Sequence, residues 1–164
     1  MQLTKIPIAT AEMLIRKPPI EVYEAFVDLA ITTRFWFTRS EGRLEAGKRI
    51  RWDWEMYAAS SLVEVKAAEP GKRILLDWGV DDEPTIVEWI FSGRGSNATI
   101  VRITNSGFSG DGDKVVAEAM ASTAGFELVL AGLKAYLEYE IELNLISDRH
   151  PDNLINHTSQ TQPT

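Results

Sequence analysis

The sequence contains no cysteine, and it has only two histidines among its 164 residues. The lack of cysteine excludes disulfides, thiolate metal sites and a cysteine nucleophile, and it is consistent with a reducing cytosol. His150 and His157 both lie in the polar stretch that ends the chain. We therefore expect neither to serve as a general base, in a catalytic triad or in a buried metal site, and we predict no metal and no cofactor.

Positive charge is also scarce, since 17 lysines and arginines face 24 aspartates and glutamates, for a net charge of −7. This balance argues against binding to a nucleic-acid backbone or to an anionic membrane surface. No apolar run approaches the ~20 residues that span a bilayer. The N-terminus also lacks the charged, apolar and small-residue order of a signal peptide. We expect a soluble cytoplasmic protein without a nucleic-acid or membrane partner.

A chain of this length fits a single domain that buries roughly 70% of its unfolded surface, enough for a core and an internal cavity. We expect a leader at residues 1–10 and one domain at residues 11–145. The remaining residues, 146–164, are polar and lack periodicity, so they are expected to form a disordered tail.

Turn signals and hydrophobic periodicity predict the order of the elements. Pro18 and Pro19 end a first strand and open a helix, PPIEVYEAFVDLA, which a second short helix, ITTRFWF, follows. From Lys48 onward apolar residues alternate with polar ones, which predicts an antiparallel meander. The expected strands are at residues 11–16, 48–54, 59–68, 73–79, 85–93 and around 99–103.

The last two strands allow a prediction of register. Their apolar faces match only if the connecting loop has an odd length, and a three-residue loop would pair Trp89 with Val101. The same register places Glu88 opposite Arg102 on the outer face, where opposite charges support the pairing.

One long amphipathic helix follows. Asp111 and Asp113 precede it and are suited to cap its free amides; a calcium loop would need further oxygen ligands that the sequence lacks. The residues expected on its apolar face are Val116, Met120, Thr123, Phe126, Leu130, Leu133 and Leu137. We predict an α+β helix-grip fold, in which a strongly bent antiparallel sheet of about six strands wraps around this helix.

The stretch RWDWE places Trp52 and Trp54 on the same face of a strand, with Asp53 on the other. Large inward aromatics usually fill a core. Buried indole nitrogens, however, need polar partners, so several indoles facing one helix also suit a partly solvated pocket. We predict that both rings face the long helix and that at least one of them lines a pocket.

These residues carry a resemblance to a known family. IRKPPIEVYEAFVDLAITTRFWF, GKRIRWDWEM, SSLVEVKAAEPGKRILLDW, ITNSGF and GFELVLAGLKAYLE occur in the order typical of one branch of the START-like superfamily. That branch takes its name from the activator of the heat-shock protein 90 ATPase. The resemblance runs from about Met13 to Glu138 and implies a cavity between the sheet and the C-terminal helix. The sequence departs from the pattern at Asn105, Phe126 and Ser60, where the family has histidine, tryptophan and glycine.

The candidate ligand-binding residues are inward aromatics, apolar residues of the long helix and one polar group that is either a pocket residue or a strand-end turn residue. They are Trp36, Trp52, Trp54, Trp78, Trp89, Phe91, Asn105, Phe108, Met120, Phe126 and Leu130. No catalytic constellation stands out, and the available carboxylates are expected at the surface. Our first hypothesis is therefore a module that binds a small, largely apolar molecule.

Two other classes stay open. The resemblance allows a regulator of heat-shock protein 90, although we find no sign of the additional N-terminal domain that members with this role carry. It also allows a cyclase or hydratase acting on polyketide-like substrates, which would need an acid or base such as Glu64 or Asp53 on the inner face. Ile90 and Ile100, expected as an apolar pair on the outer face, allow a weak homodimer.

Overall fold

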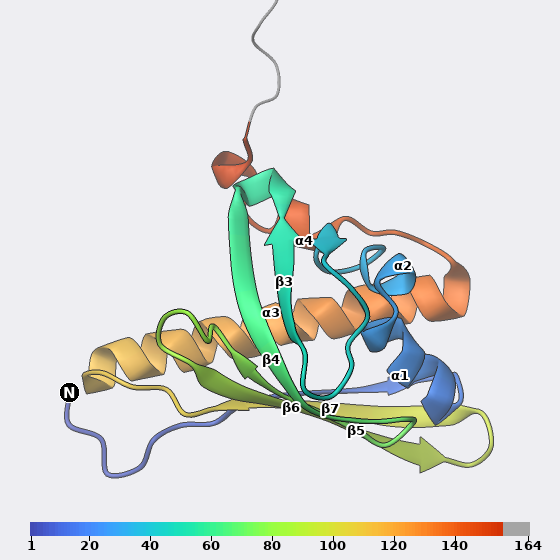
Figure 1. The fold of residues 1–164 in the computed structure, drawn as a ribbon, viewed down its shortest axis with the longest axis horizontal. Coiled ribbons are helices and arrows are strands. Elements are labelled where there is room, and N and C mark those ends of the chain that lie inside the picture. The colour runs from blue at the N-terminus through green and yellow to red at the C-terminus, as the bar shows by residue number, and fades with distance from the viewer. Residues whose placement is uncertain (156–164) are drawn as a thin grey trace, which may run out of the picture.

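The computed structural model of the chain describes residues 1–155. Seven antiparallel strands form one sheet in the order β1-β7-β6-β5-β4-β3-β2 (Figure 1). The strands are β1 (Ala9–Ile15), β2 (Arg39–Ser40), β3 (Arg49–Trp54), β4 (Ala59–Glu69), β5 (Arg73–Trp78), β6 (Thr85–Arg94) and β7 (Ala98–Ser106). The helices are α1 (Pro19–Val27), α2 (Leu29–Thr32), α3 (Gly112–Tyr139) and α4 (Leu145–Asp148), with 3₁₀ turns η1 (Glu55–Tyr57) and η2 (Pro151–Asn153). The predicted α+β helix-grip fold is confirmed, and the additional strand is the two-residue β2.

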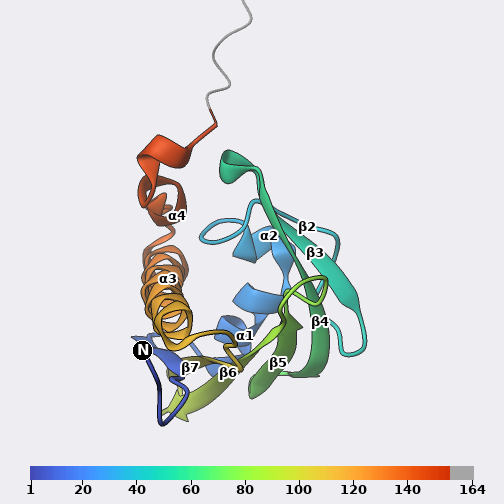
Figure 2. The same ribbon diagram turned by 90° about the vertical axis from the view of Figure 1, so that its left-hand side faces the viewer.

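The sheet is bent, and α3 lies along its open side (Figure 2). A register shift between Val65 and Ala67 interrupts the ladder of β4 with β5, and such bulges bend a strand and increase its twist. The inner faces of the strands, α1 and α3 together enclose one apolar core, in which Phe26 of α1 and Leu130 of α3 are buried. The core therefore fills the bend and holds the helix against the sheet.

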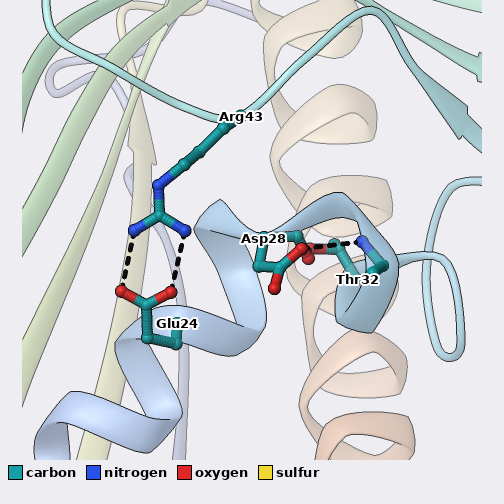
Figure 3. A network of polar contacts seen from close by, with 5 residues as sticks. Glu24, Asp28, Thr32 and Arg43 are labelled. Atoms are coloured by element: carbon teal, nitrogen blue, oxygen red, sulfur yellow. Dashed lines mark hydrogen bonds and ion pairs between the residues drawn. The ribbon is translucent and has the colours of Figure 1, made fainter.

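Two prolines set the start of the helical pair. Pro18 is the N-cap of α1 in an extended conformation, and Pro19 follows in the first turn, where a missing N–H costs nothing. Asp28 then ends α1 and caps α2, because its Oδ1 accepts a hydrogen bond from the Ala30 backbone N–H at 3.0 Å (Figure 3). Two short helices are present as predicted, but α1 ends at Val27 and α2 covers Leu29–Thr32, so only the first two residues of ITTRFWF are helical. The turn after α2 carries Trp36 toward the core.

An ion pair fixes the loop between β2 and β3 to α1. The two Nη atoms of Arg43 donate to the carboxylate of Glu24 at 2.8 and 2.7 Å, in the bidentate geometry that guanidinium favours (Figure 3). These hydrogen bonds lower the pKa of Glu24 and raise that of Arg43. The loop is thereby held beside α1.

The β6–β7 hairpin has the predicted three-residue loop, but one position later in the sequence. Arg94 pairs with Ala98, so Trp89 pairs with Ile103 and not with Val101. A displacement of two residues keeps every side chain on its predicted face, because the side-chain period of a strand is two. The outer charges find other partners: Glu88 contacts Arg73 at 2.7 Å, and Arg102 contacts Glu12 of β1.

The long helix begins as predicted, and Phe126, Leu130 and Leu133 are buried as predicted, but the rest of its buried face differs. The Asp111 side chain accepts from the backbone N–H groups of Asp113 and Lys114, which caps α3. The buried residues are Val115, Ala119, Phe126, Val129, Leu130, Gly132 and Leu133. Met120, predicted on the buried face, is 68% exposed. In its N-terminal half α3 turns small residues toward its neighbours, and the longer side chain of Met120 points outward.

The apolar character of α3 extends beyond its buried face. By length and composition alone, α3 is long and apolar enough to cross a membrane, although the sequence showed no obvious apolar run of that length. In this structure Phe126, Leu130 and Leu133 pack into the core, as expected for the central helix of this fold.

The segment after α3 is folded as far as residue 155, which differs from the predicted tail. Ile146 of α4 packs against the core. The Tyr57 hydroxyl lies within hydrogen-bond distance of the carbonyl oxygens of Ile146 and Ser147, and the Ile155 N–H donates to the Met56 carbonyl oxygen at 2.9 Å. The chain thus returns from the end of α3 to the outer end of β3 and β4. The rest of the predicted tail, residues 156–164, lies outside the described residues.

Candidate functional site

A cleft of about 810 Å³ lies between α3 and the sheet, at the end where β3 and β4 meet η1. The loop between β5 and β6 and the segment after α3 complete its walls. Its larger apolar and aromatic lining residues are Trp36, Trp54, Tyr57, Trp78, Phe108, Phe126, Val129 and Ile146. Its polar lining includes Ser60, Ser61, Asp81, Asp82, Glu83, Asn105, Glu118, Ser122, Arg149 and His150. The helix grip therefore leaves open space at one end instead of closing completely.

Six of the predicted ligand-binding residues line this cleft, and five do not. Those that line it are Trp36, Trp54, Trp78, Asn105, Phe108 and Phe126. Trp52, Trp89, Phe91 and Leu130 are buried in the core beneath it, and Met120 points away to solvent. Strand parity identified the inward face but could not tell which inward residues lie under the cleft and which lie under packed side chains.

The two tryptophans of RWDWE separate at this boundary. Trp52 is 0% exposed, and its ring stacks on Phe37 with centroids 4.9 Å apart and an interplanar angle of 22°. Trp54 is the last residue of β3 and lines the cleft. Its ring contacts those of Trp36, Phe37 and Trp78 but stays partly exposed. One indole therefore belongs to the core and the other to the cleft wall.

The aromatic floor of the cleft is a packed group of rings, not an open cage. Trp54 stacks on Trp78 with centroids 6.0 Å apart and an interplanar angle of 26°. Trp36 contacts both at 6.2 and 5.7 Å, and Phe126 of α3 meets Trp78 edge-on at 6.1 Å and 90°. Such offset and edge-to-face contacts fix the rings relative to one another. The floor therefore offers a rigid apolar surface to whatever enters the cleft.

Asn105 links the sheet to α3 at the cleft wall. Its Nδ2 donates to the Ile86 carbonyl oxygen at 3.0 Å, and its Oδ1 accepts from the Ser122 hydroxyl at 2.9 Å. Both ends of the amide are thus engaged, as a buried polar group requires. The sequence allowed Asn105 to be either a pocket residue or a strand-end residue. It is both, since it lines the cleft and lies one residue before the end of β7.

Acidic residues gather at one end of the cleft. Asp81, Asp82 and Glu83 of the β5–β6 loop are exposed and line the cleft together with Glu118 of α3. The Lys114 ammonium hydrogen-bonds to Glu83, which raises the pKa of Lys114, and lies 3.8 Å from Glu118. Lys114 partly balances the negative charge there.

The other end of the cleft holds residues that the sequence did not identify. Arg149 and His150 line it, and both come from the segment that was predicted to be a tail. The ring of His150 meets that of Tyr57 at a centroid distance of 6.3 Å. A histidine that we expected to be remote from any site therefore lies at this one. The short apolar pair Leu145 and Ile146, in an otherwise polar stretch, could have indicated that this segment packs against the domain.

Glu64 and Asp53, the two carboxylates that the enzyme hypothesis required on the inner face, lie outside the cleft. Glu64 forms ion pairs with Arg49 at 3.2 Å and Lys66 at 2.9 Å, and the hydrogen bond from Lys66 lowers its pKa. Asp53 pairs with Arg51 at 2.9 Å, and neither carboxylate lines the cleft. These pairs belong to the outer face of the sheet.

Two polar atoms beneath the floor have no partner. The indole Nε1 atoms of Trp52 and Trp89 are buried and make no hydrogen bond within the described residues. Neither residue lines the cleft, so they back its floor rather than face its interior. Within residues 1–155, no group of three or more histidine or acidic side chains is arranged to hold a metal ion.

Comparison with known proteins identifies relatives of this fold. Residues 16–138 match the family described as activator of Hsp90 ATPase homolog 1-like protein. Among curated proteins, none matches the sequence. The crystal structure of protein SSP2350 from Staphylococcus saprophyticus is 27% identical, with a TM-score of 0.72, and the match covers 84% of this chain and 96% of that one.

Two further solved structures share the fold at lower identity. The Aha1 dimer from Colwellia psychrerythraea, solved in solution, is 18% identical with a TM-score of 0.70, and the match covers 81% of this chain and 97% of that one. BexL, a di-domain ARO/CYC protein from the BE-7585A biosynthetic pathway, is 19% identical with a TM-score of 0.68. That match covers 80% of this chain and 46% of BexL.

Proposed function

Since the chain belongs to the activator of Hsp90 ATPase homolog 1-like family and its helix grip leaves an aromatic cleft open, we propose that it binds a small, largely apolar ligand in that cleft. The observation that carries the proposal is the aromatic floor of Trp36, Trp54, Trp78 and Phe126. These rings lie at the bottom of a space of about 810 Å³, within the range of small-molecule sites.

The arrangement of the floor supports a ligand with a flat apolar body. The rings are fixed by contacts with one another, so a ligand can be placed on them without a large cost of ordering side chains. Charged side chains lie at the two ends of the cleft, where they can orient a ligand whose body rests on the rings.

Fluorescence titration tests this proposal. N-phenyl-1-naphthylamine is a neutral probe with a naphthalene and a phenyl ring, and its emission rises in apolar surroundings. It should bind saturably with one site per chain. Trp54→Ala should weaken binding at least about tenfold, because a floor ring contributes on the order of 1.4 kcal/mol or more. Met120→Ala is the control, since Met120 is exposed on α3 and does not line the cleft.

Trp52→Ala tests whether a core tryptophan and a tryptophan of the cleft floor differ in their contribution to stability. Because Trp52 is fully buried, its truncation should lower the free energy of unfolding by about 3–5 kcal/mol, more than the truncation of Trp54. If no neutral apolar probe binds saturably, or if Trp54→Ala and Met120→Ala bind the probe equally well, the proposal is wrong.

A second candidate is an enzyme that closes or dehydrates rings in the same cleft. The observation that favours it is that a carboxylate, Glu118, and an imidazole, His150, both line the cleft, where an acid or base must be. Incubation with a poly-β-ketone thioester should then give products that have lost water, detected by mass spectrometry, and His150→Gln should abolish them. Unchanged thioester in the wild-type reaction would exclude this activity.

A further inference from the structure

Arg149 is the only lysine or arginine among the described residues that line the cleft. It follows α4, and its backbone N–H donates to the Leu145 carbonyl oxygen at 3.1 Å. Its side chain reaches across to α3: a Cβ at Gly125 would lie 4.0 Å from the Arg149 Nη1 atom. The guanidinium therefore lies beside a glycine, where no α3 side chain separates it from the helix.

The guanidinium of Arg149 has no protein acceptor among residues 1–155. None of the side-chain hydrogen bonds or ion pairs there involves it, although the residue is only partly exposed. Arg43 pairs with Glu24 and Arg73 with Glu88. Arg16, Arg39 and Arg94 also lack a side-chain partner among these residues, but they are exposed, whereas Arg149 is only partly exposed. A guanidinium carries five donors in a planar fork that matches an oxyanion, and it is costly to keep partly buried without a partner.

The acidic residues of the cleft lie away from Arg149. Glu118 precedes Gly125 by seven residues, which is about 10 Å along the axis of α3. Glu83 of the β5–β6 loop is bound to Lys114, further still toward the start of the helix. The cleft thus has an acidic end and a basic end, with the aromatic floor between them. An anion entering it would be repelled at the first end and attracted at the second.

We propose that Arg149 binds an oxyanion of the ligand, so that the ligand class is an aromatic or polycyclic acid. Its flat body rests on the floor of Trp54 and Trp78, and its carboxylate or sulfonate lies against the guanidinium near Gly125. This inference rests on the proposed ligand-binding function and adds the charge and orientation of the ligand. Arg149 acts here as a binding and specificity residue.

Two probes with the same anilinonaphthalene body test the inference. The neutral probe is N-phenyl-1-naphthylamine, and its anionic counterpart is 8-anilino-1-naphthalenesulfonate, which adds one sulfonate. The wild-type protein should bind the anionic probe about tenfold or more tighter than the neutral one, and the two should compete for one site. The preference should shrink in 0.5 M salt, where the Debye length falls to roughly 4 Å.

Arg149→Gln should remove the preference by weakening the anionic probe about tenfold while leaving the neutral probe within twofold. Arg149→Lys keeps the charge and should retain part of the preference. Arg102→Gln is the matched control, because Arg102 pairs with Glu12 on the opposite side of the sheet and does not line the cleft. Unfolding curves of all three variants show whether a loss reflects misfolding, and the neutral probe reports the same cleft independently.

The outcomes distinguish this inference from the proposal on which it depends. If neither probe binds saturably, both the proposed ligand binding and the role of Arg149 are wrong. If the neutral probe binds and the anionic probe binds no tighter, or if Arg149→Gln keeps the preference, the binding function stands and the role of Arg149 is overturned. A preference lost only in Arg149→Gln, and partly kept in Arg149→Lys, supports the inference.

Discussion

Residues on the inner face of the sheet either fill the core or line the cleft, and their burial distinguishes the two roles. Trp52 and Trp54 are two positions apart on β3, yet the first is sealed by Phe37 and the second borders the cleft. The turn after α2 supplies Phe37, which stacks on Trp52 and helps to bury it, whereas Trp54 stays partly exposed at the cleft. Similar side chains on one face can therefore have different functions.

Leu130 and Met120 give a sharp contrast on α3. Leu130→Ala should lower the free energy of unfolding by about 2–5 kcal/mol, because the side chain is fully buried and its loss leaves a cavity. Met120→Ala should change it by less than about 0.5 kcal/mol, since the side chain is 68% exposed. Denaturant titrations of both variants measure the difference, and equal effects would mean that the buried face of α3 is misassigned.

Glu24 should make stability depend on pH. Hydrogen bonds from Arg43 lower the pKa of Glu24 in the folded state, so folding favours the ionised carboxylate. Its contribution is therefore present above the unfolded pKa and is lost as pH falls through the folded pKa. Relative to the wild type, Glu24→Gln should cost about 0.5–1 kcal/mol at pH 7, an amount already reduced by solvent screening.

The same comparison at pH 3 supplies the control. As pH falls toward and through the folded-state pKa of Glu24, the wild-type carboxyl takes up its proton, so the gap in unfolding free energy between wild type and Glu24→Gln should be narrower than at pH 7. A gap that is equal at both pH values would show that Arg43 does not favour the ionised form of Glu24.

At the scale of elements, the segment after α3 closes one end of the cleft. It contributes Ile146, Arg149 and His150 to the lining and is held to η1 by Tyr57 and by the Ile155 N–H. Because η1 connects β3 to β4, the same contacts also brace the free end of that hairpin. The element combines a structural and a ligand-facing role.

Truncation measures that role. A chain ending at Ile146 loses the hydrogen bonds of Ser147 and Ile155, so its free energy of unfolding should fall by about 1–3 kcal/mol, and its Tm by several degrees. A chain ending at Ile155 keeps every described contact and serves as the control. An unchanged Tm in the shorter chain, relative to the control, would show that the segment does not stabilise the domain.

For the whole molecule, one core joins α1, the sheet and α3, so the described residues should unfold as a single cooperative unit. Near-ultraviolet circular dichroism reports the tryptophan cluster, and far-ultraviolet circular dichroism reports the helices and strands. Their denaturant midpoints should coincide. Separate midpoints would mean that α3 leaves the sheet before the sheet unfolds.

The sequence by itself determined the fold, because its signals are local and repetitive. Alternation from Lys48 onward fixes which face of each strand is inward, and a register displaced by two, as at Trp89, leaves that result unchanged. The paired prolines and the aspartate caps set the helix starts. The family resemblance then implied a cavity between sheet and helix, and the sequence identified Trp54, Trp78 and Phe126 among its candidate residues.

Only the tertiary structure decided where the cleft lies and which residues face it. Met120 and Phe126 both fit the helical period, but Met120 is 68% exposed and Phe126 is buried, because packing against the sheet selects which apolar residues of α3 are covered. Arg149 and His150 reach the cleft because the chain folds back after α3, a path set by contacts such as that of Tyr57 with Ser147, 90 positions apart. Periodicity carries no information about such long-range contacts, since they depend on how the finished elements pack.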